Sequence, residues 1–217
     1  DDHSRFNIRI EPKTSATGVK DSFIHAFSEY GLPNAVLSDN GAQFAGAHKG
    51  LSFFERFLMD LDILPIHGRP IHPQTQGKEE RFHRTLNEDL IKRTPIRDLS
   101  HAQQLFDDYL VEFNTERPHN SLGLDVPSKH YTRSHRDLPE EIKEPEYDVG
   151  KTLRKVNYKG YISLRNHRYY LSETFIDKYM ELAYLDEKTI AVCYGNFTIA
   201  KIDIDEQLII SKRIYRR

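Results

Sequence analysis

Two carboxylates, Asp39 and Glu80, constrain this chain more than any other feature of its sequence. Asp39 follows a short apolar strand predicted at 35–37, and Glu80 lies in the first turn of an amphipathic helix predicted at 78–93. Side chains at the carboxyl ends of strands gather at one edge of an α/β sheet. Carboxylates gathered in this way are suited to hold Mg²⁺ for phosphoryl-transfer chemistry. The sequence therefore predicts an α/β fold with a metal site that includes both residues.

Each carboxylate also has an ordinary structural explanation. The sequence Asp39-Asn40-Gly41 favours a turn, because Asn and Gly tolerate positive φ. Glu79 and Glu80 both lie in a first helical turn, where acidic groups stabilise the helix through its macrodipole. Helical phase places Glu79 close to the apolar stripe and Glu80 on the polar flank. Periodicity therefore favours Glu80 as the metal ligand.

The bulk composition is that of an ordinary globular protein. A chain of 217 residues with 38% hydrophobic content suffices for one large domain or two small ones. It has no run of eighteen apolar residues, so we expect no membrane span. The single cysteine, Cys193, excludes an intramolecular disulfide and predicts a reducing, cytoplasmic compartment.

Up to residue 132 the hydrophobic pattern alternates between strands and helices, which predicts an α/β or α+β core. Strands are expected at 5–10, 35–37 and 63–66, and helices at 14–30, 53–61, 78–93 and from Ser100 onward. Ser100 and Gln103 have the spacing of a capping box. The acidic, proline-containing segment 133–150 is expected to be a linker.

Beyond residue 150 the pattern changes to the period of two that is typical of strands. Strands are expected at 160–164, 168–171, 189–194 and 197–202, the last two joined by a Gly195-Asn196 turn. Short strands in hairpin succession predict a small all-β domain over 151–217, a barrel of about five strands.

The net charge of −2 divides unevenly along the chain. Residues 1–150 carry 18 Lys and Arg against 25 Asp and Glu, whereas residues 151–217 carry 13 against 8. This asymmetry favours contact with a polyanion by the C-terminal part, although solvated charges would give a similar pattern. The candidate DNA-binding residues are Lys78, Arg81, Arg84, His72, Lys212, Arg213, Arg216 and Arg217. The spacing of His67, His72 and His83 matches no familiar zinc site.

Three ordered motifs closely resemble the integrase-core transposases of bacterial insertion sequences. These motifs are Ser38 to Phe44, Pro70 to Leu86 and Asn114 to Gly123. The family is related to retroviral integrases and has an RNase H-like catalytic fold. The resemblance spans about residues 1–132, and the domain at 151–217 resembles a small barrel that some members carry behind the core.

The resemblance implies an Asp-Asp-Glu site that binds two Mg²⁺ or Mn²⁺ ions and cleaves and transfers DNA strands in transposition. Asp39 matches the second Asp of this site. Glu80 matches the Glu, which in the family directly precedes the Arg of a Gly-Lys-x-Glu-Arg pattern. The first Asp belongs on the first core strand, which we expect upstream of Asp1. The implied partners are transposon-end and target DNA and further copies of the protein, without a membrane or a small-molecule cofactor.

The expected fold class is therefore α/β (α+β): an RNase H-like integrase core without its first strand, a linker and a small basic β-barrel. Three functions are open. The first is that of a transposase or integrase fragment, which alone would transfer strands negligibly. The second is that of a catalytically inactive DNA-binding remnant that co-assembles with intact transposase. The third is an RNase H-type nuclease, which the Gly-Lys-x-Glu-Arg helix and the Arg-Pro-His segment argue against.

Overall fold

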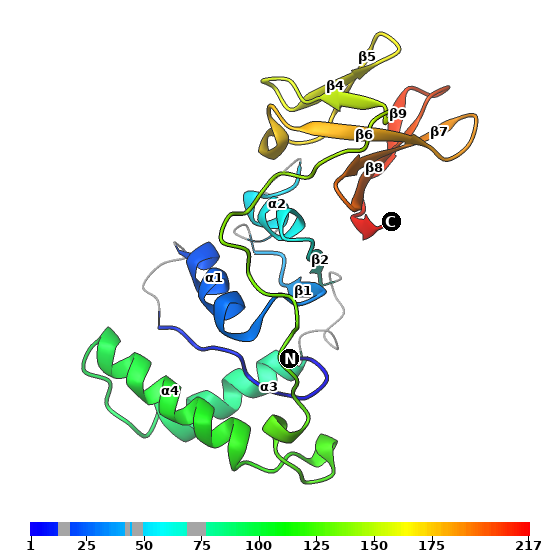
Figure 1. Cartoon of the computed structure of the whole chain (residues 1–217). Coiled ribbons are helices and arrows are strands. Elements are labelled where there is room, and N and C mark those ends of the chain that lie inside the picture. The colour runs from blue at the N-terminus through cyan, green and yellow to red at the C-terminus, as the bar shows by residue number, and fades with distance from the viewer. Residues whose placement is uncertain (13–17, 42–43, 45–49, 69–76) are drawn as a thin grey trace. The chain divides into compact units, whose positions relative to one another are not determined.

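The chain forms two compact units, each built from an early and a late segment. The structure, a computed structural model, describes residues 1–12, 18–41, 44, 50–68 and 77–217 (Figure 1). The first unit combines Asp1–Leu32 with Pro70–Leu138, and the second combines Pro33–Arg69 with Pro139–Arg217. The predicted mixed α/β class with a β-rich C-terminal part is confirmed. The domain boundaries at 132 and 150 stay predictions.

The first unit is helical. Its elements are α1 (Val19–Tyr30), α3 (Gly77–Leu86), the π-helical turn η2 (Asn87–Ile91), α4 (Leu99–Thr115), η3 (Asn120–Leu122) and η4 (Pro127–Lys129). Helices α3 and α4 pack through an aromatic core, in which the ring of Phe82 meets the edge of Phe113 at 5.1 Å. Arg117 binds Asp89 at 2.5 Å and so joins the segment after α4 to η2. The helices predicted at 78–93 and from Ser100 onward are confirmed.

The prediction of a strand at 5–10 is wrong, because within the described structure this segment pairs with side chains rather than with another strand. The Asn7 amide donates to Oδ1 of Asn114 at 2.9 Å, and the Asn114 amide group donates back to the Asn7 carbonyl at 2.9 Å. Gln103 donates to the carbonyl of Ile10 at 3.0 Å. Side-chain amides of α4 therefore satisfy the backbone groups that a sheet would otherwise pair.

A capping side chain and a glycine determine where two helices begin or end. Asp98, not Ser100, caps α4, and its carboxylate accepts from the His101 amide at 2.8 Å. Ser100 lies inside the first turn, so the predicted capping box is wrong. Helix α1 ends at Gly31 as predicted, where φ is +77° and a Cβ atom would lie 2.7 Å from the Ser134 carbonyl oxygen.

The second unit begins with two parallel strands and the helix that connects them. Strand β1 (Ala35–Ser38) pairs with β2 (Leu64–His67), with Ser38 opposite His67. Helix α2 (Phe53–Asp60) starts with a capping box made by Ser52 and Glu55. The strands predicted at 35–37 and 63–66 and the helix at 53–61 are confirmed.

Residues 151–217, the β-domain, form one antiparallel sheet and a separate hairpin. The strands are β3 (Leu153–Lys155), β4 (Tyr161–Leu164), β5 (His167–Tyr170), β6 (Tyr179–Tyr184), β7 (Thr189–Tyr194), β8 (Phe197–Asp203), β9 (Leu208–Ser211) and β10 (Tyr215–Arg216). The sheet order is β10-β8-β7-β6-β3, with β9 also on β8, and β4 pairs with β5. All four predicted strands are present, but the expected number of about five is too low. The strands that periodicity missed include the very short β3 and β10. Closure into a barrel stays a prediction.

Helix α2 shares the hydrophobic core of the β-domain. Met59, only 3% exposed, belongs to the same buried cluster as Ile190 and Phe197. Next to it, the Tyr194 hydroxyl donates to Asp60 at 2.6 Å. The β-domain and the segment that contains β1, α2 and β2 therefore form one packing unit.

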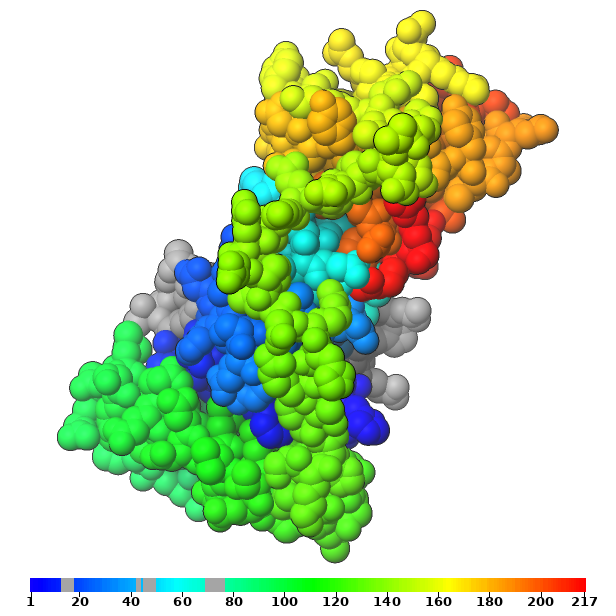
Figure 2. Space-filling view, viewed as in Figure 1, coloured from blue at the N-terminus to red at the C-terminus, as the bar shows by residue number. Residues whose placement is uncertain are grey.

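The predicted linker contains no helix or strand between residues 133 and 150, all of which are described. Its later part nevertheless packs on the second unit, where the Tyr147 hydroxyl donates to the Tyr179 carbonyl at 2.7 Å. Glu144 forms an ion pair with Lys178. Figure 2 shows this yellow-green segment on the surface beside the cyan atoms of α2. Residues 139–150 therefore pack along the surface of the β-domain.

We predict that Met59→Ala destabilises the β-domain as well as α2. Loss of a buried Met side chain removes apolar contacts and leaves a cavity, which lowers the free energy of unfolding by about 2–4 kcal/mol. Urea unfolding measures the loss, and amide hydrogen exchange should show weaker protection along β7 and β8. Phe53→Ala, on the same helix but at a side chain that is 68% exposed, should change stability by less than about 1 kcal/mol. Unchanged protection of β7 in Met59→Ala would contradict the shared core.

Candidate functional site

Asp39 lies immediately after strand β1, as its sequence predicts. Its side chain is exposed, and its Oδ1 accepts a hydrogen bond from the Gly41 amide at 2.8 Å. Within the described part of the chain, the other carboxylate oxygen has neither a hydrogen-bond nor an ion-pair partner. Asp39 thus forms the turn that Asp-Asn-Gly favours and still keeps one oxygen open.

The backbone on both sides of Asp39 is tied to the end of β2. The Gly68 amide donates to the Ser38 carbonyl at 3.1 Å, which extends the β1–β2 ladder. The Asn40 side chain donates to the Gly68 carbonyl at 3.0 Å. Residues 38 and 40 therefore both bind the backbone of Gly68, and these contacts restrain the position of Asp39.

A partly exposed histidine paired with a buried glutamate supports the same strand ends. Nε2 of His67 lies 2.9 Å from Oε1 of Glu55, and Nδ1 lies 3.1 Å from the Ser38 hydroxyl. The Glu55 side chain is 4% exposed, and its Oε2 accepts from the Ser52 amide at 2.6 Å. The hydrogen bond to Glu55 raises the pKa of His67 against the opposing effect of burial, and the charge of Asp39 adds to the rise.

Glu80 is exposed in the first turn of α3. Neither an ion pair nor a hydrogen bond engages its carboxylate anywhere in the described residues. Its neighbour Glu79 faces His83 at 3.7 Å. Glu80 is thus the unengaged member of the pair, which is consistent with the helical-phase argument. Its role as a ligand stays a prediction.

The basic residues around Glu80 differ in how they are engaged. Lys78 binds Asp2 at 2.6 Å and lowers the pKa of that carboxyl group. Arg81 and Arg84 are exposed, and their guanidinium groups make no ion pair with any described residue. His72 lies outside the described residues. Arg81 and Arg84 are therefore the cations of α3 that remain available to an anion.

The structure describes Asp39 and Glu80 in different units, the second and the first respectively. No three His, Cys, Asp or Glu side chains of the described residues gather as metal ligands. Each of the two carboxylates nevertheless offers open, hard oxygen atoms, which are the donors that Mg²⁺ and Mn²⁺ prefer. The donor chemistry of both residues fits such an ion.

The predicted basic tail is partly committed to internal contacts. Arg216 binds Asp62 at 2.6 Å, and Arg217 binds Glu181 at 2.8 Å. Nζ of Lys212 lies 5.1 Å from the centre of the Tyr170 ring, and burial lowers the pKa of Lys212. The Arg213 side chain has no ion-pair partner among the residues described. Lys212 and Arg213 are therefore better placed to meet a ligand than the last two arginines.

Comparison with known proteins shows what this chain is similar to. A family model described as "Integrase core domain" matches residues 61–127. An uncharacterized protein of insertion element IS136 from Agrobacterium fabrum is 29% identical over 119 residues, which cover 52% of this chain and 58% of that protein. Residues 61–127 therefore match an integrase core domain, and we refer to the protein as the integrase-core chain for this similarity. The Gag-Pro-Pol polyprotein of squirrel monkey retrovirus is 35% identical over 93 residues, 41% of the integrase-core chain and 5% of the polyprotein.

Two solved structures resemble the integrase-core chain. The catalytic core domain of BIV integrase is 26% identical, with a TM-score of 0.45 over 59% of this chain and 78% of that one. The simian T-cell lymphotropic virus intasome, in complex with a PP2A regulatory subunit, is 15% identical. Its TM-score is 0.44, and the match covers 82% of this chain and 58% of that one. The integrase-core chain spans little more than half the length of its insertion-element relative. None of its described helices has the length and apolar character needed to cross a bilayer.

Sequence reasoning missed the Ser38–His67–Glu55 contacts of the integrase core. The sequence singles out His67 only through a histidine spacing that matches no familiar zinc site, and it gives Glu55 no distinct role. One signal was present, because Ser52-x-x-Glu55 before an apolar run is the signature of a capping box. The contact between Glu55 and His67 joins residues twelve apart through tertiary packing, which no local pattern reports.

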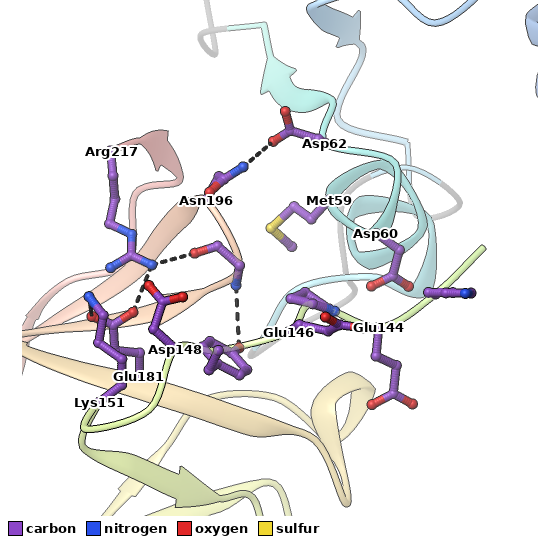
Figure 3. A pocket seen from close by; sticks show the side chains of 14 residues that line it. Met59, Asp60, Asp62, Glu144, Glu146, Asp148, Lys151, Glu181, Asn196 and Arg217 are labelled. Carbon is purple, nitrogen blue, oxygen red and sulfur yellow. Dashed lines mark hydrogen bonds and ion pairs between the residues drawn. The ribbon is translucent and has the colours of Figure 1, made fainter. Parts of the chain in front are cut away.

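A polar cavity of about 360 Å³ lies in the second unit of the integrase-core chain (Figure 3). Its acidic lining residues are Asp60, Asp62, Glu144, Glu146, Asp148 and Glu181. Figure 3 shows Arg217 reaching Glu181. Arg217 also donates to the Gly195 carbonyl at 2.6 Å. Lys151 binds the same Glu181 carboxylate at 3.0 Å. The Glu181 contacts therefore stabilise the β-domain rather than form a metal site.

We predict that Glu181→Gln removes a contribution to the free energy of unfolding that the protein has at neutral pH and loses at acid pH. Arg217 lowers the pKa of Glu181 against the opposing effect of burial, and Lys151 lowers it further. A carboxyl group whose pKa is lower in the folded state than in the unfolded state contributes to stability above its unfolded pKa of about 4.3. This contribution is lost as the pH falls through the folded-state pKa. The variant should therefore lose about 1–3 kcal/mol at pH 7 and much less at pH 3. Urea unfolding at each pH measures this difference.

Glu146→Gln is the matched control, because Glu146 lines the same cavity but is exposed and has no partner in the described structure. Its stability should follow that of the unmodified protein at every pH. A deficit of Glu181→Gln that stays constant from pH 7 to pH 3 would contradict the prediction.

Proposed function

We propose that this chain carries part of the catalytic machinery of a transposase, which cleaves and transfers DNA strands with divalent metal ions. Asp39 and Glu80 are the proposed metal ligands. The observation that carries the proposal is their open coordination: each is exposed and keeps oxygen atoms without a partner in the described residues. Their motifs occur in the order found in the integrase-core family, and the family model covers Glu80.

The chain's own residues supply ligands and phosphate contacts. When bound, Mg²⁺ or Mn²⁺ would provide Lewis-acid activation of water or a DNA 3′-hydroxyl at the phosphorus. Asp39 would hold its ligand oxygen in a fixed position, because residues on both sides bind Gly68. Arg81 and Arg84 would pair with phosphate oxygens and set the register of the DNA.

The β-domain offers a second DNA-contact surface, the basic-aromatic face of Tyr161, Arg168, Tyr170 and Lys212. Tyr161 and Tyr170 are cross-strand partners with ring centres 5.1 Å apart. Arg168 lies two residues from Tyr170 on β5 and therefore on the same face of the hairpin. Lys212 lies over the Tyr170 ring. Cations beside aromatic rings suit a nucleic acid, because they contact phosphates while the rings contact bases or sugars.

A second candidate function is that of a non-catalytic DNA-binding protein that assembles with a complete transposase. The excess of 13 basic over 8 acidic residues in 151–217 favours it. Both functions require DNA as a partner, and the first also includes assembly with further copies of the chain. The two differ in a single measurable property, which is metal-dependent cleavage.

We predict that Mg²⁺-dependent nicking of labelled duplex DNA depends on both carboxylates. Asp39→Asn and Glu80→Gln should each lower the nicking rate by more than about 100-fold, because each substitution removes a charged metal ligand. Glu79→Gln is the matched control, since Glu79 faces His83, and its rate should stay within about threefold.

DNA binding that weakens with salt but is not followed by nicking would favour the second candidate. Nicking that is unchanged in Asp39→Asn would exclude the proposed ligand and point to a contaminating nuclease.

We predict that Arg168→Ala/Lys212→Ala weakens DNA binding and lowers its salt dependence. Each phosphate contact contributes about 0.9 to the magnitude of the slope of log affinity against log salt concentration. The magnitude of this slope should therefore be about 1.8 smaller in the double variant, which lacks two such contacts. Arg216→Ala/Arg217→Ala is the control, because these arginines bind Asp62 and Glu181. It should lower thermal stability and leave the slope unchanged. Fluorescence anisotropy at several salt concentrations checks both, and the reverse result would reassign the contacts to the tail.

A further inference from the structure

Three side chains from separate elements meet next to Asp39. Ser38 ends β1, His67 ends β2, and Glu55 lies in the first turn of α2. The His67 ring lies between the other two, 3.1 Å from the Ser38 hydroxyl and 2.9 Å from the Glu55 carboxylate. Both ring nitrogens are engaged, so the ring orientation is fixed from two sides.

Glu55 makes this contact rigid. Its side chain is 4% exposed, and one carboxylate oxygen is already held by the Ser52 amide at 2.6 Å. A buried carboxylate is strongly destabilising unless it is hydrogen-bonded or paired. Because His67 is the side chain that pairs with Glu55 here, separating them would leave a buried charge uncompensated.

The contact reaches Asp39 through the backbone. Asp39 lies between Ser38, whose hydroxyl meets His67, and Asn40, whose side chain binds the carbonyl of Gly68. Gly68 directly follows His67 and donates its amide to Ser38. Movement of His67 would therefore displace both neighbours of Asp39.

We propose that His67 is a positioning residue for Asp39: it locks the ends of β1 and β2 to α2, so that the Asp39 carboxylate is held ready for a divalent metal ion. The inference rests on the proposed function, in which Asp39 is a metal ligand. His67 itself does not bind the ion, since both of its ring nitrogens face Ser38 and Glu55.

The test uses the ¹⁵N-labelled 217-residue chain and Mn²⁺ alone as the probe. Paramagnetic broadening of the amide signals of residues 39–41 reports Mn²⁺ at Asp39, and its midpoint concentration gives the affinity. Exchange of the Gly68 amide reports the metal-free order of the strand ends. His67→Phe keeps a ring but removes both hydrogen bonds. It should raise the Mn²⁺ midpoint about 10-fold or more and accelerate Gly68 exchange.

Two variants separate positioning from general stability. His67→Gln retains a donor for Glu55, and its midpoint should return to within about 1.5-fold of the unmodified value. His25→Phe makes the same substitution at an exposed histidine of α1 and should change neither readout. A loss of stability alone would shift the thermal midpoint without moving the Mn²⁺ midpoint measured well below it.

The outcomes distinguish the positioning role of His67 from the assignment of Asp39 as a metal ligand. A His67→Phe protein with the unmodified Mn²⁺ midpoint overturns the positioning role, even if Asp39→Asn abolishes broadening. Broadening at 39–41 that persists in Asp39→Asn overturns the metal-ligand assignment instead. If His67→Phe does not fold, Ser38→Ala takes its place: a midpoint raised about threefold supports the proposal, and an unchanged midpoint overturns it.

Discussion

Helix α2 is the constraint on which the second unit depends, because its two ends serve different partners. At its N-terminus, the capping box places Glu55 against His67 and so supports the ends of β1 and β2. At its C-terminus, Met59 enters the core of the β-domain and Asp60 accepts from Tyr194. One short helix therefore couples the strand ends beside Asp39 to the packing of a sheet that is formed by strands between residues 153 and 216.

Elements with a strong local pattern could be predicted from the sequence, and elements defined by their partners could not. The apolar run before Asp39 and the stripe on α3 specify a strand and a helix by periodicity alone. The alternation at 5–10 is equally regular, yet Asn114 and Gln103 supply its hydrogen bonds in place of a strand. Sequence alternation reports which faces are buried, but not which groups pair with the backbone.

The same distinction applies to the charged residues. Composition shows that residues 151–217 are basic, and it favoured the tail as the DNA contact. The structure shows Arg216 and Arg217 bound to Asp62 and Glu181, whereas Lys212 lies over an aromatic ring. An arginine whose guanidinium already binds a carboxylate must break that contact to meet a phosphate. Counting charges therefore overestimates the cations available to DNA.

The contacts of each carboxylate also separate those that hold the fold together from those proposed as metal ligands. Glu55 and Glu181 are buried, and the carboxylate oxygens of each are already engaged by basic or backbone donors. Asp39 and Glu80 are exposed and keep oxygen atoms without partners in the described structure. An exposed acid alone would be unremarkable, since most surface acids are solvated. These two differ because they lie in motifs that resemble those of integrase-core transposases, with Glu80 inside the segment that the family model matches. Asp39 is also flanked by residues that hold its backbone in place. The combination of an open carboxylate with a restrained backbone is what a metal ligand requires.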